Sequence, residues 1–457
     1  MAKQVYPGQW WCPTEPENKV AGTLYLDESG PRLELLGFFT EPSTSMMPSL
    51  PSRTILGHSG GQGITLAECF ITSYTEGPQT SSADLSCRFA FIGALLSDDQ
   101  AQKFSRIRFR VEHLDNWAGR RPFRRKSEDG AENARFEYPE VFEAVVPGAS
   151  ISLARDLVVS TSRISTLSLE SHEVLTVQAT EPRSIYDLDY FYVRPIEHLL
   201  DLAAVESAKA FDLEVFVENA SGSHLWAQVH MAGESINSSS AESVHPSQML
   251  FGMDSLGFRR AIEAWFAVED QCSDICDLLF SLSGQSTTYA TSQAFEAFSA
   301  LEGMHRRVVD ESEPDVGHKE RLGRIYAACD EGDREWLKGK LQHSHQVSYA
   351  TRLKELHAEA GGAAQGFAEK PNKWVRYIVD TRNQLAHQFE SESKILESPE
   401  KLVFLTWSAR AVLSIVLAKR LGFDDADCVR MFQYQPNWKH RAAMIRHYLP
   451  ELFSRFP

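Results

Sequence analysis

Trp374-Val-Arg-Tyr-Ile-Val-Asp-Thr-Arg-Asn-Gln-Leu-Ala-His-Gln-Phe389 is the most informative segment of the chain. It contains no proline or glycine and no long β-branched run, so it predicts an α-helix. At 100° per residue its apolar side chains fall in an arc of roughly 140°, with Arg382 near the middle of that arc. An unpaired buried charge is strongly unfavourable. The helix therefore predicts either a buried ion pair for Arg382 or a positive group that faces a pocket or a subunit interface.

The chain is long enough for two or three domains, and its charge is unevenly distributed. It has 457 residues and a net charge of −16. From Pro371 to the end, 13 Lys and Arg stand against 9 Asp and Glu, so the negative charge belongs to the preceding part. An acidic body argues against a general nucleic-acid coat protein, but a mildly basic C-terminal region leaves room for local contact with phosphates.

Cysteine usage and hydropathy predict a cytoplasmic protein without a membrane partner. No apolar run reaches the roughly 18 residues that a membrane-spanning helix needs. The first residues lack the apolar core of a signal peptide. The seven cysteines form no Cys-x-x-Cys motif, which suits free thiols in a reducing compartment.

The pattern of elements predicts an α+β multidomain fold. Short alternating segments such as Ala21–Leu26 and His224–Met231, separated by Pro, Gly and Ser, indicate a β-rich region of sandwich or barrel type over residues 1–252. One helix that begins near Pro195 interrupts these strands. Residues 253–457 show helical spacing throughout. The predicted helices there cover about 258–282, 288–309, 317–330, 332–343, 346–359, 372–390, 399–421 and 438–455.

Gly57-His58-Ser59-Gly60-Gly61 matches the G-x-S-x-G nucleophile elbow of serine hydrolases. That motif requires a strand before the serine and a helix after it, whereas Ile64 and the residues that follow it look like a strand. A β-turn in which glycines supply positive φ is the preferred interpretation. A serine hydrolase acting through Ser59 stays open as an alternative.

Two other groups of residues have structural interpretations that we prefer to functional ones. Cys272 and Cys276 lie four apart on a predicted amphipathic helix without further ligands nearby, which favours core thiols over a zinc site. Basic residues also gather between positions 106 and 126, and we expect them to face solvent and to be balanced by the acidic body. We therefore predict neither a metal nor a cofactor.

Arg382, Asn383 and His387 form the one constellation for which the functional interpretation is stronger. An arginine can hold a phosphate through two parallel hydrogen bonds, and a histidine can exchange a proton near neutral pH. RNA supplies its own nucleophile, the 2′-OH, so a protein needs only proton transfer and charge stabilisation to cleave it. These residue types on one helix predict metal-independent RNA cleavage.

At these residues the sequence resembles the HEPN superfamily, whose ribonucleases carry an R-x4–6-H motif near the start of a late helix in a bundle of four to five helices. The whole chain resembles the ApeA group of phage-defence proteins, which place a β-rich region before a HEPN domain; that domain would have its core at about 288–457 here. The segment Ile55-Leu-Gly-His-Ser-Gly-Gly-Gln-Gly-Ile-Thr-Leu contributes to this wider resemblance.

The resemblance implies a function and partners. Arg382 and His387 would be the catalytic pair of an endoribonuclease and Asn383 a supporting polar residue, with Glu302 as an additional partner from a neighbouring helix. HEPN ribonucleases commonly act as homodimers whose motifs face each other, which would explain an arginine on an apolar face. The substrate would be RNA, with transfer RNA as one candidate, and cleavage would block translation on infection. The β-rich region would sense a phage-derived trigger or restrain the nuclease.

Two alternatives belong to other functional classes. In one, the chain is a non-catalytic interaction protein whose Arg382 forms an ion pair within its own chain. In the other, the β-rich region binds a carbohydrate or peptide and the HEPN domain only dimerises. The catalytic hypothesis predicts that the edge carrying Arg382 and His387 is open to a cleft and close to its symmetry mate.

Overall fold

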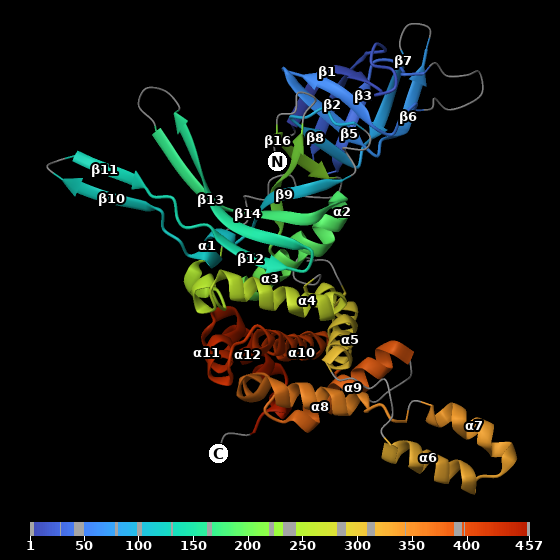
Figure 1. The fold of residues 1–457 in the computed structure, drawn as a ribbon. Helices are drawn as coiled ribbons and strands as arrows, with labels where there is room; N and C mark the ends of the chain where they lie inside the picture. The colour runs from blue at the N-terminus through green and yellow to red at the C-terminus, as the bar shows by residue number, and fades with distance from the viewer. Residues whose placement is uncertain are drawn as a thin grey trace. The chain divides into compact units, whose positions relative to one another are not determined.

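The computed structural model consists of two compact units (Figure 1). It describes residues 4–27, 29–40, 50–77, 81–97, 103–128, 131–161, 167–218, 224–231, 244–280, 289–308, 316–342, 344–387, 395–396 and 398–454. The first unit comprises residues 1–200, 208–246 and 252–263, and the second comprises 201–207, 247–251 and 264–457. The first is β-rich and the second helical, which confirms the predicted fold class.

The described strands of the first unit, apart from one separate hairpin, form a single 14-stranded sheet. Its order is β12-β13-β14-β9-β15-β16-β8-β5-β4-β1-β2-β3-β7-β6. The strands of its N-terminal part are β1 Gln4–Trp11, β2 Val20–Asp27, β3 Gly30–Leu35, β4 Ile55–Ser59, β5 Gln62–Ala67, β6 Phe70–Glu76, β7 Ser81–Ser86 and β8 Phe89–Ile92.

This N-terminal part of the sheet curls around a common core. Residues alternate between buried and half-buried along β2, as expected for a strand with one face on a core. Trp10, Leu24, Ile64 and Leu85, from four different strands, belong to one buried cluster. Strands β3 and β8 are not hydrogen-bonded neighbours, yet they approach each other, which shows that the sheet bends back on itself. The curl buries apolar side chains that a flat sheet would leave in water.

The remaining strands include two ribbons that extend from the sheet (Figure 1). These strands are β9 Phe104–Val111, β10 Phe123–Glu128, β11 Ala131–Phe136, β12 Phe142–Val146, β13 Ala149–Thr161, β14 Leu167–Arg183, β15 Ala210–Glu218 and β16 His224–Met231. One ribbon is the separate β10–β11 hairpin, and the other is formed by the ends of β13 and β14. The short helix α1, Leu114–Ala118, precedes the first ribbon.

One helical stretch between β14 and β15 contains a π-helical turn. It begins with α2, Ile185–Leu188, whose N-cap Ser184 accepts a hydrogen bond from the Asp187 amide. The π-helical turn Asp189–Val193 and α3, Arg194–Ala204, continue it. Pro195 is the second residue of α3, so the helix predicted there is confirmed, but it continues an earlier helical stretch instead of starting at the proline.

The helices of the second unit lie where the sequence predicts most of them. Its described helices are the part of α4 (Phe258–Phe280) that starts at Ala264, then α5 Ala290–Val308, α6 Val316–Ala328, α7 Glu331–Leu341, α8 Tyr349–Ala360, α9 Pro371–His387, α10 Pro399–Arg420, α11 Asp425–Tyr434 and α12 Pro436–Tyr448. The predicted helix at 438–455 is too long at its C-terminal end, because α12 stops at Tyr448 before Pro450.

Helix α10 is the core helix of this unit. By length and composition it could cross a membrane, and 78% of its most apolar window is buried within the protein. Buried residues occur all around it, from Leu402 to Ala418. A helix that is hydrophobic on all sides belongs in the middle of a bundle, where neighbours cover every face.

Candidate active site at the end of α9

Helix α9 is anchored by the buried residues of its first half. Trp374, Val375 and Ile378 are at most 3% exposed, as the helical periodicity predicts. The indole Nε1 of Trp374 donates a hydrogen bond of 2.9 Å to Ser408 Oγ on α10. This anchor fixes both the rotation and the position of α9. The residues of its last turns are therefore presented in a defined direction.

The motif occupies the C-terminal part of α9. Arg382 is the twelfth of the 17 residues of α9, and His387 is the last. The expectation that the motif lies near the start of a late helix is therefore wrong for this chain. The helix begins as early as Pro371, because proline is well suited to a first turn and the residues after it have helical spacing.

Burial decreases along α9 toward the motif. Thr381 is fully buried, Arg382 and Leu385 are partly buried, and Asn383 and Ala386 are exposed. The side chain of His387 lies outside the described part of the structure, as does Phe389. Within the described residues, the apolar face of α9 is therefore buried in the first half of the helix and partly exposed beside Arg382.

Among the described residues, Arg382 makes one ion pair. Its Nη2 lies 3.4 Å from Glu302 Oε2 on α5, and the side chains are 29% and 19% exposed. The guanidinium also lies over the ring of Tyr349, 5.6 Å from the ring centroid. Its Nε is buried and has no hydrogen-bond partner among the described residues. A single contact of 3.4 Å engages only part of a guanidinium that can donate five hydrogen bonds.

Glu302 is shared between two arginines. Its Oε1 accepts a hydrogen bond of 2.9 Å from Arg306 Nη2, one helical turn further along α5, while Oε2 contacts Arg382. The expected pairing of Glu302 with Arg382 is therefore present. One carboxylate facing two guanidinium groups leaves an excess positive charge. Such a site attracts an additional anion.

Tyr349 forms an uncharged platform beside this pair. Its hydroxyl donates a hydrogen bond of 2.9 Å to the backbone oxygen of Phe298. Burial raises the pKa of Tyr349, the charge of Glu302 adds to this, and that of Arg382 opposes it. The phenol is therefore protonated at neutral pH, and its ring can attract the guanidinium as a cation–π partner.

A buried polar network connects the helices that carry Glu302 and Tyr349. On α5, His305 Nε2 contacts Glu355 Oε2 at 2.5 Å, and Arg352 Nη1 lies 3.1 Å from His305 Nδ1. Because arginine only donates, Nδ1 must accept, which places the imidazole proton on Nε2 toward Glu355. His305 and Arg352 are 2% and 1% exposed. This network fixes α8 against α5 and so fixes the surroundings of Arg382.

Sequence reasoning missed Tyr349, Arg306 and this network. The available signal was spacing: Phe298, Glu302 and His305 repeat at intervals of four and three, and Tyr349, Arg352 and Glu355 at intervals of three. Each set therefore occupies one helical face. The sequence did not indicate that the two faces meet.

The serine-hydrolase alternative does not agree with the local fold. Ser59 ends β4, and Gly60 and Gly61, with φ of 57° and 85°, form the turn into β5. The Oγ of Ser59 donates a hydrogen bond of 2.7 Å to the Pro7 oxygen and is largely buried. A strand follows this serine where the nucleophile elbow needs a helix, so the predicted β-turn is confirmed.

The cysteines have the structural role that was preferred, whereas the basic residues have only part of it. Cys272 and Cys276 are buried, and burial raises the pKa of the Cys276 thiol well above its usual range. Among the described residues, no group of three or more His, Cys, Asp or Glu is placed to hold a metal. Arg108 Nε donates a hydrogen bond of 2.7 Å to Glu214, and Arg110 pairs with Asp212 at 3.1 Å. These arginines are balanced by acidic residues as predicted, but they lie on strand β9 with side chains only 28% and 23% exposed, so the prediction that they face solvent is wrong for them.

Fold and motif together define a class of protein: a β-sheet unit followed by a helical unit that carries an arginine–histidine motif. The model of ApeA N-terminal domain 1 matches residues 5–265, and the model of the Apea-like HEPN domain matches residues 295–427. The chain belongs to the ApeA family, and its C-terminal region is a HEPN domain of the ApeA type. No curated protein and no solved structure matches the chain.

Proposed function

We propose that this protein is an anti-phage endoribonuclease whose catalytic residues are Arg382 and His387, supported by Asn383. Family membership supports the role in phage defence. The observation that carries the catalytic proposal is the state of Arg382. Its guanidinium is partly exposed and, among the described residues, forms an ion pair only with Glu302, through Nη2 at 3.4 Å, whereas its Nε is buried. It therefore has donors available for a phosphate.

The proposed reaction transfers the phosphoryl group within the RNA itself. A histidine removes the proton of the 2′-OH, the 2′-oxygen attacks the neighbouring phosphorus, and the bond to the 5′-oxygen breaks. The leaving 5′-oxygen takes up a proton. The products are a 2′,3′-cyclic phosphate, or its opened form, and a 5′-OH. His387 exchanges the protons, and Arg382 stabilises the charge on the phosphate in the transition state.

Asn383 and Glu302 have supporting roles in this proposal. Asn383 is exposed beside Arg382, so its amide can contact the phosphate or orient His387. Glu302 and the ring of Tyr349 hold the guanidinium in place before RNA binds. A positioned arginine needs little reorganisation during the reaction, which is the main source of electrostatic catalysis.

The proposal includes the partners and the place of action. The protein acts in the cytoplasm as a homodimer with two motifs facing one cleft, on RNA that can include transfer RNA, and its cleavage blocks translation on infection. The β-rich unit senses a phage-derived trigger or restrains the nuclease. These roles rest on the resemblance to HEPN ribonucleases and on the acidic charge of the chain, which disfavours unspecific RNA binding.

The decisive experiment compares wild type with Arg382→Ala, His387→Ala and Arg376→Ala during phage challenge. Arg376 is a matched control, because it lies on the same helix, is 72% exposed and pairs only loosely with Asp380. We expect the first two variants to lose RNA cleavage by about 100-fold or more and to lose protection. Arg376→Ala should protect like wild type. RNA integrity, the 3′ ends of the fragments and plaque counts are the measurements.

A second candidate function is a non-catalytic interaction protein, which the internal Arg382–Glu302 pair favours. Thermal unfolding separates the two. A purely structural pair predicts that Arg382→Ala and Glu302→Gln lower the melting temperature together, with no RNA cleavage in wild type. Full protection by both Arg382→Ala and His387→Ala would rule out the nuclease.

A further inference from the structure

The α6–α7 hairpin, residues 316–341, has no buried residue in the described chain. Neither α6 with 13 residues nor α7 with 11 contributes a side chain to the core. The two helices pack against each other, and Arg334 Nε donates a hydrogen bond of 3.1 Å to the Tyr326 oxygen. Helices of this length are marginal in water without tertiary packing. The described part of the chain buries none of its side chains, so the hairpin presents a surface that a partner can cover.

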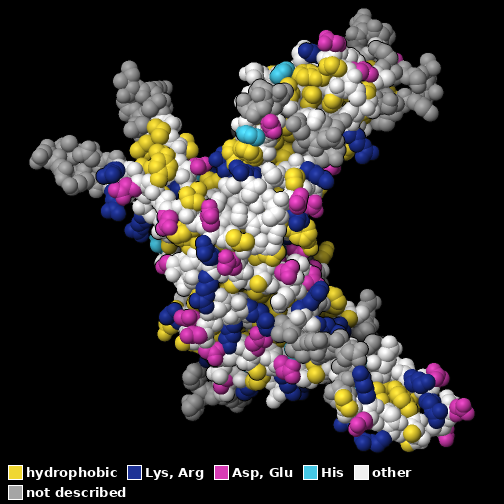
Figure 2. Space-filling view, viewed as in Figure 1, with side chains coloured by type: hydrophobic (Ala, Val, Ile, Leu, Met, Phe, Trp, Pro, Cys, Tyr) yellow, Lys and Arg dark blue, Asp and Glu magenta, His cyan; other side chains and the backbone are white. Residues whose placement is uncertain are grey.

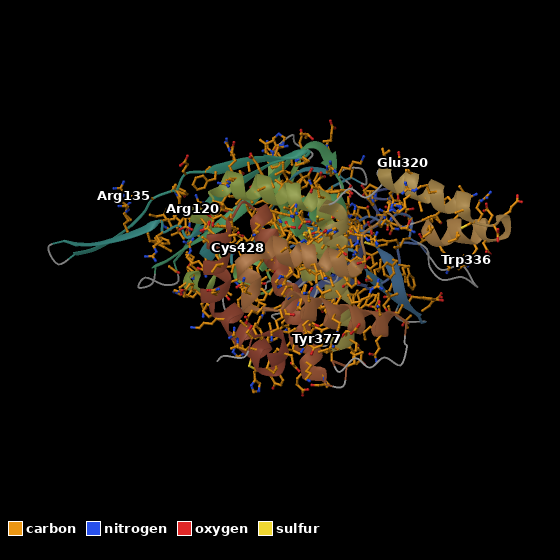
Figure 3. All side chains as sticks on the ribbon, turned by 90° about the horizontal axis from the view of Figure 1, so that it is seen from below. Arg120, Arg135, Glu320, Trp336, Tyr377 and Cys428 are labelled. Atoms are coloured by element: carbon orange, nitrogen blue, oxygen red, sulfur yellow. The ribbon has the colours of Figure 1, made fainter. Side chains whose placement is uncertain are left out.

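The hairpin carries the apolar side chains that such a partner would cover. Ile325 is 36% exposed and Trp336 is 63% exposed. Figure 2 shows hydrophobic side chains gathered over this hairpin with charged side chains around them. Figure 3 shows Trp336 and Glu320 on the hairpin, beside the rest of the helical unit. Tryptophan is usually well buried in folded chains, and exposed apolar patches with a polar rim mark interaction sites.

The charges of the hairpin identify the kind of partner. Between residues 316 and 341 there are six Lys or Arg and five Asp or Glu, so the surface is close to neutral. An RNA-binding surface would have a clear excess of basic residues. A near-neutral surface that carries both signs is compatible with a second copy of itself, since each patch of a two-fold interface meets its own equivalent.

The distribution of the two signs fits such self-pairing. On α6, Lys319, Arg321 and Arg324 outnumber the single Glu320. On α7, Glu331, Asp333 and Glu335 gather around Arg334 in the first half, and Lys338 and Lys340 follow in the second half. A two-fold arrangement that places α6 of one copy against α7 of the other brings opposite charges together. It also completes a four-helix bundle from two hairpins, each of which supplies one half of the apolar core.

We propose that the α6–α7 hairpin is a homodimerisation arm, which pairs with the same hairpin of a second copy to form a four-helix bundle centred on Ile325 and Trp336. The arm leaves the HEPN region after α5 and returns before α8, the helices that carry Glu302 and Tyr349. Pairing of the arms therefore holds two candidate sites in one molecule. This last point rests on the proposed function, whereas the pairing itself does not.

The test measures the molar mass of the full chain by light scattering coupled to size exclusion. Wild type should have the mass of two chains at micromolar concentration, and Trp336→Glu and Ile325→Glu should each raise the dissociation constant about 30-fold or more. Tyr434→Glu is the matched control, because Tyr434 is 73% exposed on α11, and it should remain dimeric. Circular dichroism verifies that the variants keep their helix content.

Cross-linking tests the same surface without removing an apolar side chain. In a Cys329→Ser background, Ile325→Cys should form a covalent dimer under mild oxidation, because residues near a two-fold axis meet their own equivalents. A monomeric wild type, a Trp336→Glu variant that stays dimeric, or a hairpin variant that loses only RNA binding would each overturn the proposal. Arg382→Ala should stay dimeric, so failure of the nuclease proposal is measured separately.

Discussion

Some of the contacts of Arg382 could be predicted from the sequence, and others could be identified only from the structure. Its position within an apolar arc correctly predicted that it needs a partner, and Glu302 provides one at 3.4 Å. The four-residue spacing of Glu302 and Arg306 is that of a helical pair, but the sequence could not show that Glu302 reaches Arg382 or that the guanidinium of Arg382 lies over the ring of Tyr349. The contact with Glu302 joins residues 80 positions apart, and periodicity reports only on neighbours within one helix.

Replacement of Glu302 by Gln tests the role of this carboxylate in the proposed reaction. The amide keeps an acceptor but removes a negative charge that competes with the RNA phosphate. We expect KM for RNA to fall a few-fold and kcat to fall about 10-fold, because the phosphate binds more tightly and Arg382 is held less firmly. Steady-state cleavage kinetics measure both, with Glu296→Gln on the same helix as a control. An unchanged kcat would assign Glu302 a structural role only.

Asp189 in the π-helical turn makes the β-rich unit sensitive to pH. Burial, together with the charge of Glu197, raises the pKa of Asp189 to about 6, whereas an unfolded chain ionises an aspartate near 4. Between these values the folded state holds more protons than the unfolded state, so this residue reduces stability as the pH rises from about 4 to 6.

Asp189→Asn should therefore stabilise the protein at pH 7.5 more than at pH 4.5, by about 1–2 kcal/mol. The asparagine cannot ionise, so it does not incur the cost of a buried charge at the higher pH. Thermal or denaturant unfolding of both proteins at the two pH values measures this difference. An equal gain in stability at both pH values would show that ionisation of Asp189 does not destabilise the folded protein.

Among the elements, the most accurately predicted are those with a complete local signal. Helices α5, α9 and α10 and strands β2 and β16 begin and end within a few residues of their predicted bounds. Helix α11 was missed, because its charged start at Asp425 and short apolar stripe resemble a loop. Strands β13 and β14 are longer than the short alternating segments that the sequence predicts for this region. Their ends form a projecting ribbon, where burial no longer imposes alternation.

The turn between β4 and β5 offers a test at this scale. Gly60 and Gly61 both have positive φ, and a Cβ added to either would meet no atom within 4 Å. Gly61→Ala should therefore cost about 1–2 kcal/mol through backbone strain alone. Gly366→Ala is the control, since its surroundings are equally open and its φ lies outside the positive range. Equal melting temperatures for the two variants would contradict the positive φ at Gly61.

In the whole molecule, the helical unit includes a segment from outside its main sequence range. Residues 247–251 belong to it, although the sequence predicted a boundary between residues 252 and 253. Gln435 Nε2 donates a hydrogen bond of 2.7 Å to the Gln248 oxygen, and the rings of Phe251 and Phe423 lie 5.1 Å apart. No local pattern predicts this membership, because it depends on what the segment contacts.

A fragment of residues 253–457 should consequently be less stable than one of residues 244–457. The shorter fragment loses the buried side chains of Leu250 and Phe251, which are 5% and 4% exposed, and each contributes about 1.5–3 kcal/mol. Comparison of the urea midpoints of the two fragments measures the difference. Identical midpoints would show that residues 247–251 add nothing to the helical unit.

The alternation of the chain between its two units limits how this protein could be recombined. The backbone passes from one unit to the other at residues 200–201, 207–208, 246–247, 251–252 and 263–264. A chimera with a single junction at the end of the β-rich unit would also exchange residues 201–207 and 247–251, so it would change the cores of both units. Exchange of the β-rich unit between relatives thus requires residues 201–207 and 247–251 to remain with the helical unit they belong to. Chimeras designed with those segments matched to the HEPN domain should fold, whereas simple domain swaps should not.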